Sequence, residues 1–173
     1  YSIRRFYVRR VKRIFPALCA VLLATLAAGW FSLLAPEFAQ LGRHVAGSAA
    51  FVANLVLYGE SGYFDAAAEL KPLLHLWSLA IEEQFYVVWP LLLAALWRWR
   101  RAVPYTMGAL IAGSFVVGLV LTERDAAGAF FLPHARFWEL LAGALLSYVE
   151  RQRQLAGRAA PPWAAHAASL LGL

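Results

Sequence analysis

Residues 75–97 read HLWSLAIEEQFYVVWPLLLAALW, and this stretch decides the class of fold. Its second half is an unbroken apolar run, whereas its first half carries a histidine, a serine and two adjacent glutamates. With two preceding leucines it forms an apolar segment, residues 73–97, that exceeds the ~20 residues needed to cross a bilayer. Other apolar segments cover residues 14–34, 105–121 and 129–149, and a further one begins near residue 163. Such continuous runs predict helices and not the alternating strands of a barrel.

The composition supports the same class. The chain of 173 residues is 62% hydrophobic and 15% charged, against about 25% charged residues in a typical soluble domain. We expect an all-α, polytopic transmembrane bundle with about five membrane segments and one short re-entrant or interfacial segment. Residues 1–173 are expected to be part of a single membrane domain. Cys19 is the sole cysteine, and no histidine–cysteine cluster has metal-ligand spacing, so no metal site is expected.

The basic residues predict the topology. If the cluster within residues 4–13 is cytoplasmic and residues 44–58 do not cross, twelve of the 16 basic residues lie inside. If residues 44–58 did cross, the cluster at residues 98–101 would move outside, against the positive-inside rule. Residues 44–58 are therefore predicted to be re-entrant or interfacial. The helix of residues 73–97 is then entered from the outer side, which puts its polar residues in the outer half. The positive charge serves topology, and no nucleic-acid partner is expected.

One face of that helix is polar. An α-helix turns by about 100° per residue, so four side chains point within roughly 80° of one another and form a polar seam: His75, Ser78, Glu82 and Tyr86. Glu83 lies about 100° further round than Glu82. A carboxylate near the bilayer centre costs about 2.5–3.5 kcal/mol, so two adjacent ones need partners. The residues alone leave two readings open: structural pairing across helices, for example with Arg136, or a water-accessible site where a carboxylate orients or deprotonates a histidine or hydroxyl.

Two further pairs have helical i,i+3 spacing. Arg10 and Arg13 lie in the basic start, where they are either a membrane anchor or a grip for the phosphates of a cytoplasmic ligand. Arg136 and Glu139 are predicted to form a structural ion pair at the start of another helix.

Four blocks in this order carry a family resemblance: RRVKRIFPAL, SGYFD, PLLHLWSLAIEEQFYVVWPLLL and ARFWELLAGALL. They resemble the acyltransferase 3 family, bacterial integral-membrane O-acyltransferases that include lipopolysaccharide O-antigen acetylases. The resemblance implies a multi-pass protein of the bacterial cytoplasmic membrane. It would move an acyl group, usually acetyl, from cytoplasmic acyl-coenzyme A to a hydroxyl of a cell-envelope or extracellular sugar. Acyl-coenzyme A is then a co-substrate, and no cofactor is bound permanently.

The resemblance also implies roles for particular residues. Arg10 and Arg13 would hold the donor's phosphates. A general-base histidine is expected upstream of Tyr1, with supporting catalytic roles for Glu82, Glu83 and His75. Ser78 and Tyr86 would line the acceptor side of the site. The chain would be the central part of a longer domain and inactive by itself.

A transporter is the alternative reading. Intramembrane carboxylates and a histidine also serve proton coupling, so a proton-coupled transporter or flippase of a glycan or small solute fits the same residues. Labelled acetyl groups appearing on an outer glycan would distinguish the enzyme from a protein that moves an unmodified solute.

Overall fold

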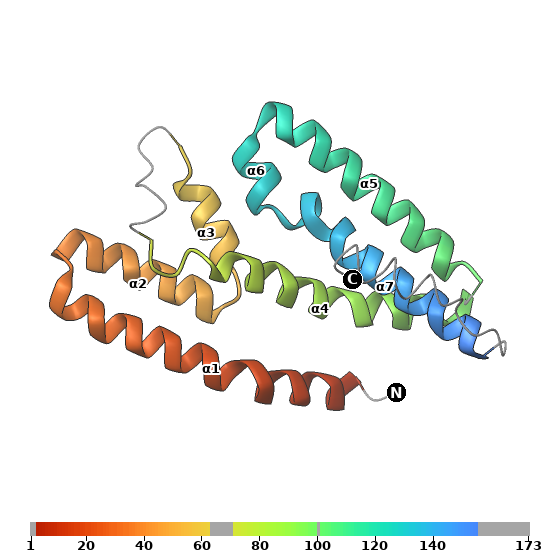
Figure 1. Cartoon of the computed structure of the whole chain (residues 1–173), viewed down its shortest axis with the longest axis horizontal. Coiled ribbons are helices and arrows are strands. Elements are labelled where there is room, and N and C mark those ends of the chain that lie inside the picture. The colour runs from red at the N-terminus through yellow and green to blue at the C-terminus, as the bar shows by residue number, and fades with distance from the viewer. Residues whose placement is uncertain (1–2, 63–70, 100, 156–173) are drawn as a thin grey trace, which may run out of the picture.

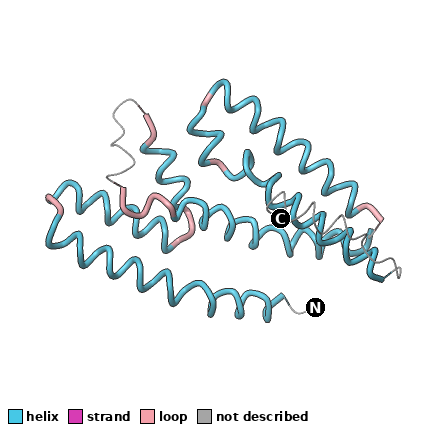
Figure 2. The backbone as a smooth tube through the Cα atoms, in the orientation of Figure 1, coloured by secondary structure: helices cyan, strands magenta, loops and turns pink. Residues whose placement is uncertain are grey.

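The computed structural model describes residues 3–62, 71–99 and 101–155, and this part of the chain is helical throughout, without strands (Figures 1 and 2). The predicted all-α class is confirmed. The elements are α1 (Ile3–Ser32), α2 (Ala35–Ala49), α3 (Ala53–Glu60), α4 (Leu76–Leu96), the 3₁₀ turn η2 (Trp97–Trp99), α5 (Val103–Arg124), α6 (Ala126–Phe131) and α7 (Pro133–Leu155).

Among the described residues, three helices are long and apolar enough to cross a membrane: α1, α4 and α5. They correspond to the predicted segments 14–34, 73–97 and 105–121. The predicted segment 129–149 is interrupted at Leu132, because Pro133 begins a new helix that ends in the charged residues of the ERQRQ stretch. The segment expected from residue 163 lies outside the described residues.

The segment predicted to be re-entrant is a helical hairpin. α2 folds back along α1, residues 50–52 reverse the chain, and α3 runs away again (Figure 1). The arms pack closely at Gly47, where an added Cβ would lie 2.8 Å from Cγ2 of Val56. Residues 35–60 therefore form two helices joined by a turn, where the sequence predicted one short segment at residues 44–58.

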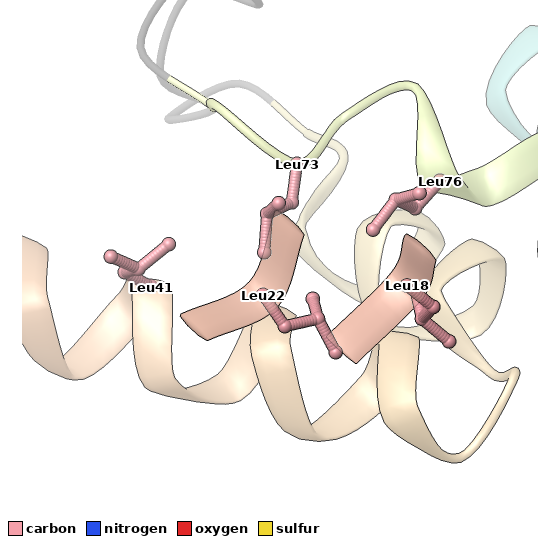
Figure 3. Close-up of a cluster of buried hydrophobic side chains, with 5 residues drawn as sticks. All are labelled: Leu18, Leu22, Leu41, Leu73 and Leu76. Atoms are coloured by element: carbon pink, nitrogen blue, oxygen red, sulfur yellow. The ribbon is translucent and has the colours of Figure 1, made fainter. Parts of the chain in front are cut away.

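A leucine cluster joins the hairpin to α1 and α4. It consists of Leu18, Leu22, Leu41, Leu73 and Leu76, all at most 8% exposed (Figure 3). Two of these leucines lie on α1 and one on α2; Leu76 is the first residue of α4, and Leu73 lies in the turn that precedes it. The leucine cluster fixes the antiparallel alignment of α1 and α4. This alignment determines which polar residues face each other further along the two helices.

The other half of the molecule is the antiparallel pair α5 and α7, joined by short α6 (Figure 1). The hydroxyl of Ser114 donates to the carbonyl of His134 at 2.7 Å and accepts from the backbone N–H of Trp138 at 3.0 Å. Ser114 thus bonds to two backbone groups that lie one helical turn apart in α7 and connects α5 to α7. α6 and α7 contact α3 and α4, which connects the two halves.

Candidate functional site

The polar centre of the structure is an ion pair between α1 and α4. Arg10 Nη2 lies 2.7 Å from Glu83 Oε1, and Arg10 Nε donates to both carboxylate oxygens at 2.8 and 3.0 Å. The two side chains are only 22% and 13% exposed. The guanidinium also lies over the Tyr86 ring, 3.3 Å from its centroid. Charge, hydrogen bonds and a π face together compensate an arginine placed against an apolar helix.

This contact corrects the predicted depth of the glutamates. We expected Arg10 on the inner side and both glutamates in the outer half, but Arg10 and Glu83 lie at the same level. The reason is that α1 is already helical from Ile3, so its basic turns run alongside α4 instead of preceding it. The hydroxyl of Tyr7 supports this alignment by donating to the carbonyl of Val87 at 3.0 Å.

A cavity of about 400 Å³ lies beside the ion pair, within the ~300–1,000 Å³ range of small-molecule sites. α1, the hairpin turn and α4 enclose it. Its lining is Tyr7, Arg10, Val11, Ile14, Phe15, Ala50, Phe51, Val52, Glu83, Gln84, Val87 and Val88. Its polar side chains are Tyr7 and Arg10 on α1 and Glu83 and Gln84 on α4, and the remainder of the lining is aliphatic or aromatic.

The hairpin turn above the cavity is held by buried amides. Gln84 donates from Nε2 to the carbonyl of Phe51 and to Asn54 Oδ1, both at 2.8 Å. Asn54 is fully buried and donates to the carbonyl of Phe131 at 3.0 Å. Phe51 has φ 55°, a left-handed conformation that is uncommon outside glycine. Sequence reasoning gave Asn54 and Gln84 no role. The signal was available, because an amide in an apolar segment needs buried partners.

Comparison with known proteins fits these features. A family described as an acyltransferase domain matches residues 1–173. The chain belongs to the acyltransferase 3 family. It is 35% identical over 157 residues to an uncharacterised protein of Haemophilus influenzae, covering 85% of this chain and 63% of that protein.

Two relatives have names that describe an activity. The chain is 32% identical over 165 residues to a putative peptidoglycan O-acetyltransferase of Bacillus subtilis, covering 91% of this chain and 26% of that protein. It is 28% identical over 155 residues to a peptidoglycan O-acetyltransferase of Listeria monocytogenes, covering 86% and 25%. The chain thus spans between a quarter and two thirds of these relatives. No solved structure matches it.

The acyltransferase 3 residues singled out in the sequence fall into two groups. Glu83, Tyr86 and Arg10 meet at the ion pair, with Arg13 exposed one turn further along α1. The rest of the predicted seam, His75, Ser78 and Glu82, is exposed on α4. Ser78 donates from its hydroxyl to the carbonyl of His75 at 3.1 Å. The predicted seam is therefore divided, because Tyr86 turns toward α1.

The predicted pair in α7 is confirmed. Arg136 Nε lies 3.1 Å from Glu139 Oε1. The guanidinium of Arg136 also lies 5.3 Å from the centroid of the Trp77 ring, so it bridges the starts of α7 and α4. Both charged side chains are about a third exposed or more, which fits a structural role.

A second polar cluster connects α2 with the last residue of α3 and was not predicted from the sequence. Glu60 Oε2 accepts from Nε2 of His44 at 2.7 Å and from Gln40 at 3.1 Å, and Lys71 Nζ lies 3.7 Å away. Burial raises the pKa of Glu60, but the hydrogen bonds from His44 and Gln40 and the charges beside it outweigh burial and lower the pKa. His44 and Glu60 are 16 positions apart and lie on two different helices, so helical periodicity does not predict their contact.

No group of three or more histidine, cysteine, aspartate or glutamate residues within the described ranges can hold a metal ion.

Proposed function

We propose that this chain forms part of a bacterial cytoplasmic-membrane O-acyltransferase that moves an acetyl group from acyl-coenzyme A to a hydroxyl of a cell-envelope glycan. Family membership and the names of the relatives support the reaction class. Those names favour peptidoglycan over lipopolysaccharide as the glycan. The observation that carries the proposal is the cavity with Arg10 and Glu83 in its wall, beside a cluster of basic residues that suits a phosphorylated donor.

Arg10 and Arg13 hold the donor's phosphates in this proposal. The bonds to Glu83 engage Nε and Nη2 of Arg10, so within the described chain the N–H groups on Nη1 have no acceptor. A guanidinium has five N–H donors in a fixed fork, and Glu83 fixes the direction of that fork. Glu83 is thus a positioning residue for Arg10. Arg13 is exposed on the same stretch of helix and supplies a second guanidinium.

The chemistry is acyl transfer from a thioester. The sugar hydroxyl loses its proton to a general-base histidine, which the family resemblance places upstream of Tyr1. The alkoxide oxygen attacks the thioester carbonyl, a C–O bond forms, the C–S bond breaks, and the thiolate recovers the proton. Glu82 orients that histidine, because it is exposed whereas Glu83 is committed to Arg10. In this proposal His75 supports the same site and Ser78 contacts the acceptor, whereas Tyr86 packs on Arg10 and not beside Ser78 as the sequence predicted.

The test uses the full-length protein in proteoliposomes with labelled acetyl-coenzyme A inside and peptidoglycan fragments outside. Arg10→Ala and Arg13→Ala should each raise KM for acetyl-coenzyme A by at least tenfold, since a hydrogen bond between charged groups is worth about 1.5–3 kcal/mol. Arg9→Ala is the matched control, because it removes the same charge from the same helix and lies neither in the cavity lining nor in the proposed Arg10–Arg13 pair.

Label on lipopolysaccharide glycan but not on peptidoglycan would correct the acceptor alone. Movement of an unmodified solute without any labelled glycan would overturn the enzyme reading and favour a transporter.

A further inference from the structure

We propose that Tyr7 is a positioning residue for Arg10. Its hydroxyl replaces a hydrogen-bond donor that Pro90 removes from α4, and this contact holds the basic end of α1 where Arg10 binds the donor. The inference rests on the proposed role of Arg10 in holding the donor's phosphates. It adds a residue that acts through Arg10 and gives the reason for its position.

Pro90 leaves a gap in the hydrogen bonds of α4. It lies inside the helix and is buried. A proline has no backbone N–H, so the carbonyl of Tyr86, four residues earlier, has no donor within its own helix. In a membrane helix such a carbonyl needs a partner from a neighbouring element. The hydroxyl of Tyr7 donates to the carbonyl of Tyr86 at 3.3 Å and to that of Val87 at 3.0 Å. Tyr7 therefore supplies the donor that the proline lacks.

The same turn of α4 also binds Arg10. Tyr7 and Arg10 are three residues apart on α1, so they lie on one face of that helix. Arg10 bonds to the carboxylate of Glu83 and lies over the Tyr86 ring. The backbone carbonyl of Tyr86 is one of the two acceptors of the Tyr7 hydroxyl. The position of Arg10 on α4 is thus coupled to the contact that Tyr7 makes.

Buried packing does not hold this end of α1. The first buried residue of the helix is Leu18, and residues 3–17 are all at least partly exposed. The basic end is held on α4 by the polar contacts of Tyr7 and Arg10 and by the ring of Phe6, which lies near the Tyr86 ring. Loss of the Tyr7 hydroxyl therefore gives this end more freedom. It lowers the fraction of molecules in which Arg10 has the geometry that binds the donor.

The experiment measures kcat and KM for acetyl-coenzyme A with the full-length enzyme in proteoliposomes. Tyr7→Phe removes only the hydroxyl. It should raise KM about three- to tenfold, the scale on which one neutral hydrogen bond shifts an equilibrium, and leave kcat unchanged. Tyr105→Phe is the matched control, because it removes the same hydroxyl from a residue of α5 that is 79% exposed.

Pro90→Ala tests the reason for the contact. This substitution returns a backbone N–H to α4, so the carbonyl of Tyr86 gains a donor within its own helix. Tyr7→Phe should therefore raise KM less in the Pro90→Ala background than in the wild-type background. An equal rise in the two backgrounds would show that Tyr7 does not compensate for the proline and would overturn the inference.

A second measurement does not depend on turnover. Spin labels on Val8→Cys and Leu91→Cys, two exposed positions on α1 and α4, report the distance between the helices. The native cysteines, Cys19 among them, are replaced by serine. Tyr7→Phe should broaden the distance distribution, whereas Tyr105→Phe should not. An active enzyme in which Tyr7→Phe leaves KM or this distribution unchanged would overturn the inference and leave the proposed function standing. A wild-type enzyme that transfers no acetyl group would instead overturn the proposed function.

Discussion

Glu83→Gln tests the ion pair on which the site depends. The substitution keeps the shape of the side chain but leaves the Arg10 guanidinium partly buried and charged without a counter-charge. Two unit charges about 4 Å apart interact by ~4 kcal/mol at an effective dielectric of 20. Exposure of 22% and 13% and the cost of desolvation reduce this, so we expect a coupling of about 2–3 kcal/mol.

The assay is a double-mutant cycle on the free energy of unfolding. Full-length protein carrying Arg10→Gln, Glu83→Gln or both is unfolded by SDS in mixed micelles and followed by tryptophan fluorescence. The double variant should be more stable than the sum of the single losses predicts, because removing both charges leaves neither one unpaired. The cation–π contact with Tyr86 is lost in both variants that lack Arg10, so it cancels in the cycle.

The matched control is the cycle for Arg136 and Glu139, an ion pair that is 31% and 42% exposed. Exposed pairs contribute about 0.2–1 kcal/mol. A coupling between Arg10 and Glu83 no larger than that of the control pair would refute the reasoning, because it would show that the first pair is not partly buried in the folded protein.

Three further substitutions test the hairpin, each by the same unfolding assay. Asn54→Ala removes a fully buried amide with partners on two elements and should cost about 1–3 kcal/mol; a smaller loss would show that water replaces it. Gly47→Ala should destabilise through the close contact with α3, whereas Gly42→Ala, with no atom within 4 Å, should be neutral or stabilising. Because the pKa of Glu60 is lowered from its ordinary value of 4.5, the ionised carboxylate stabilises the fold above pH 4.5, and this stabilisation is lost as the pH falls further. The free energy of unfolding of Glu60→Gln should therefore depend less on pH in this acidic range.

The sequence predicted the positions of the helices better than the contacts between them. Apolar runs located α1, α4 and α5 because a membrane-spanning helix needs a minimum length of apolar residues. The pair Arg136–Glu139 was predictable because both members lie on one helix and the helical repeat brings them together. Length and charge predicted a short re-entrant or interfacial segment at residues 44–58, but they did not predict that residues 35–60 form two helices with a turn between them.

The contacts between helices were not predictable in the same way. The periodicity of α4 places Glu82 and Glu83 on different faces, but it does not say which face meets α1. Arg10 and Glu83 are 73 residues apart, and their meeting depends on the leucine cluster that aligns α1 with α4. Charge counting also says which end of a helix is inside but not where the helix begins. That is why Arg10 was placed too far from the glutamates.

The triplet EEQ at residues 82–84 shows what the fold adds to the sequence. Successive helical residues point about 100° apart, so three adjacent polar side chains cannot share one partner. Glu83 turns to α1 and fixes Arg10, while Gln84 turns to the hairpin and holds the backbone of Phe51. Glu82 is left exposed. One turn of helix thus fixes the direction of Arg10, holds the backbone of the hairpin turn and leaves one carboxylate exposed. The three adjacent polar residues therefore do not form one site. Glu83 and Gln84 each bond to a different element, and Glu82 is exposed.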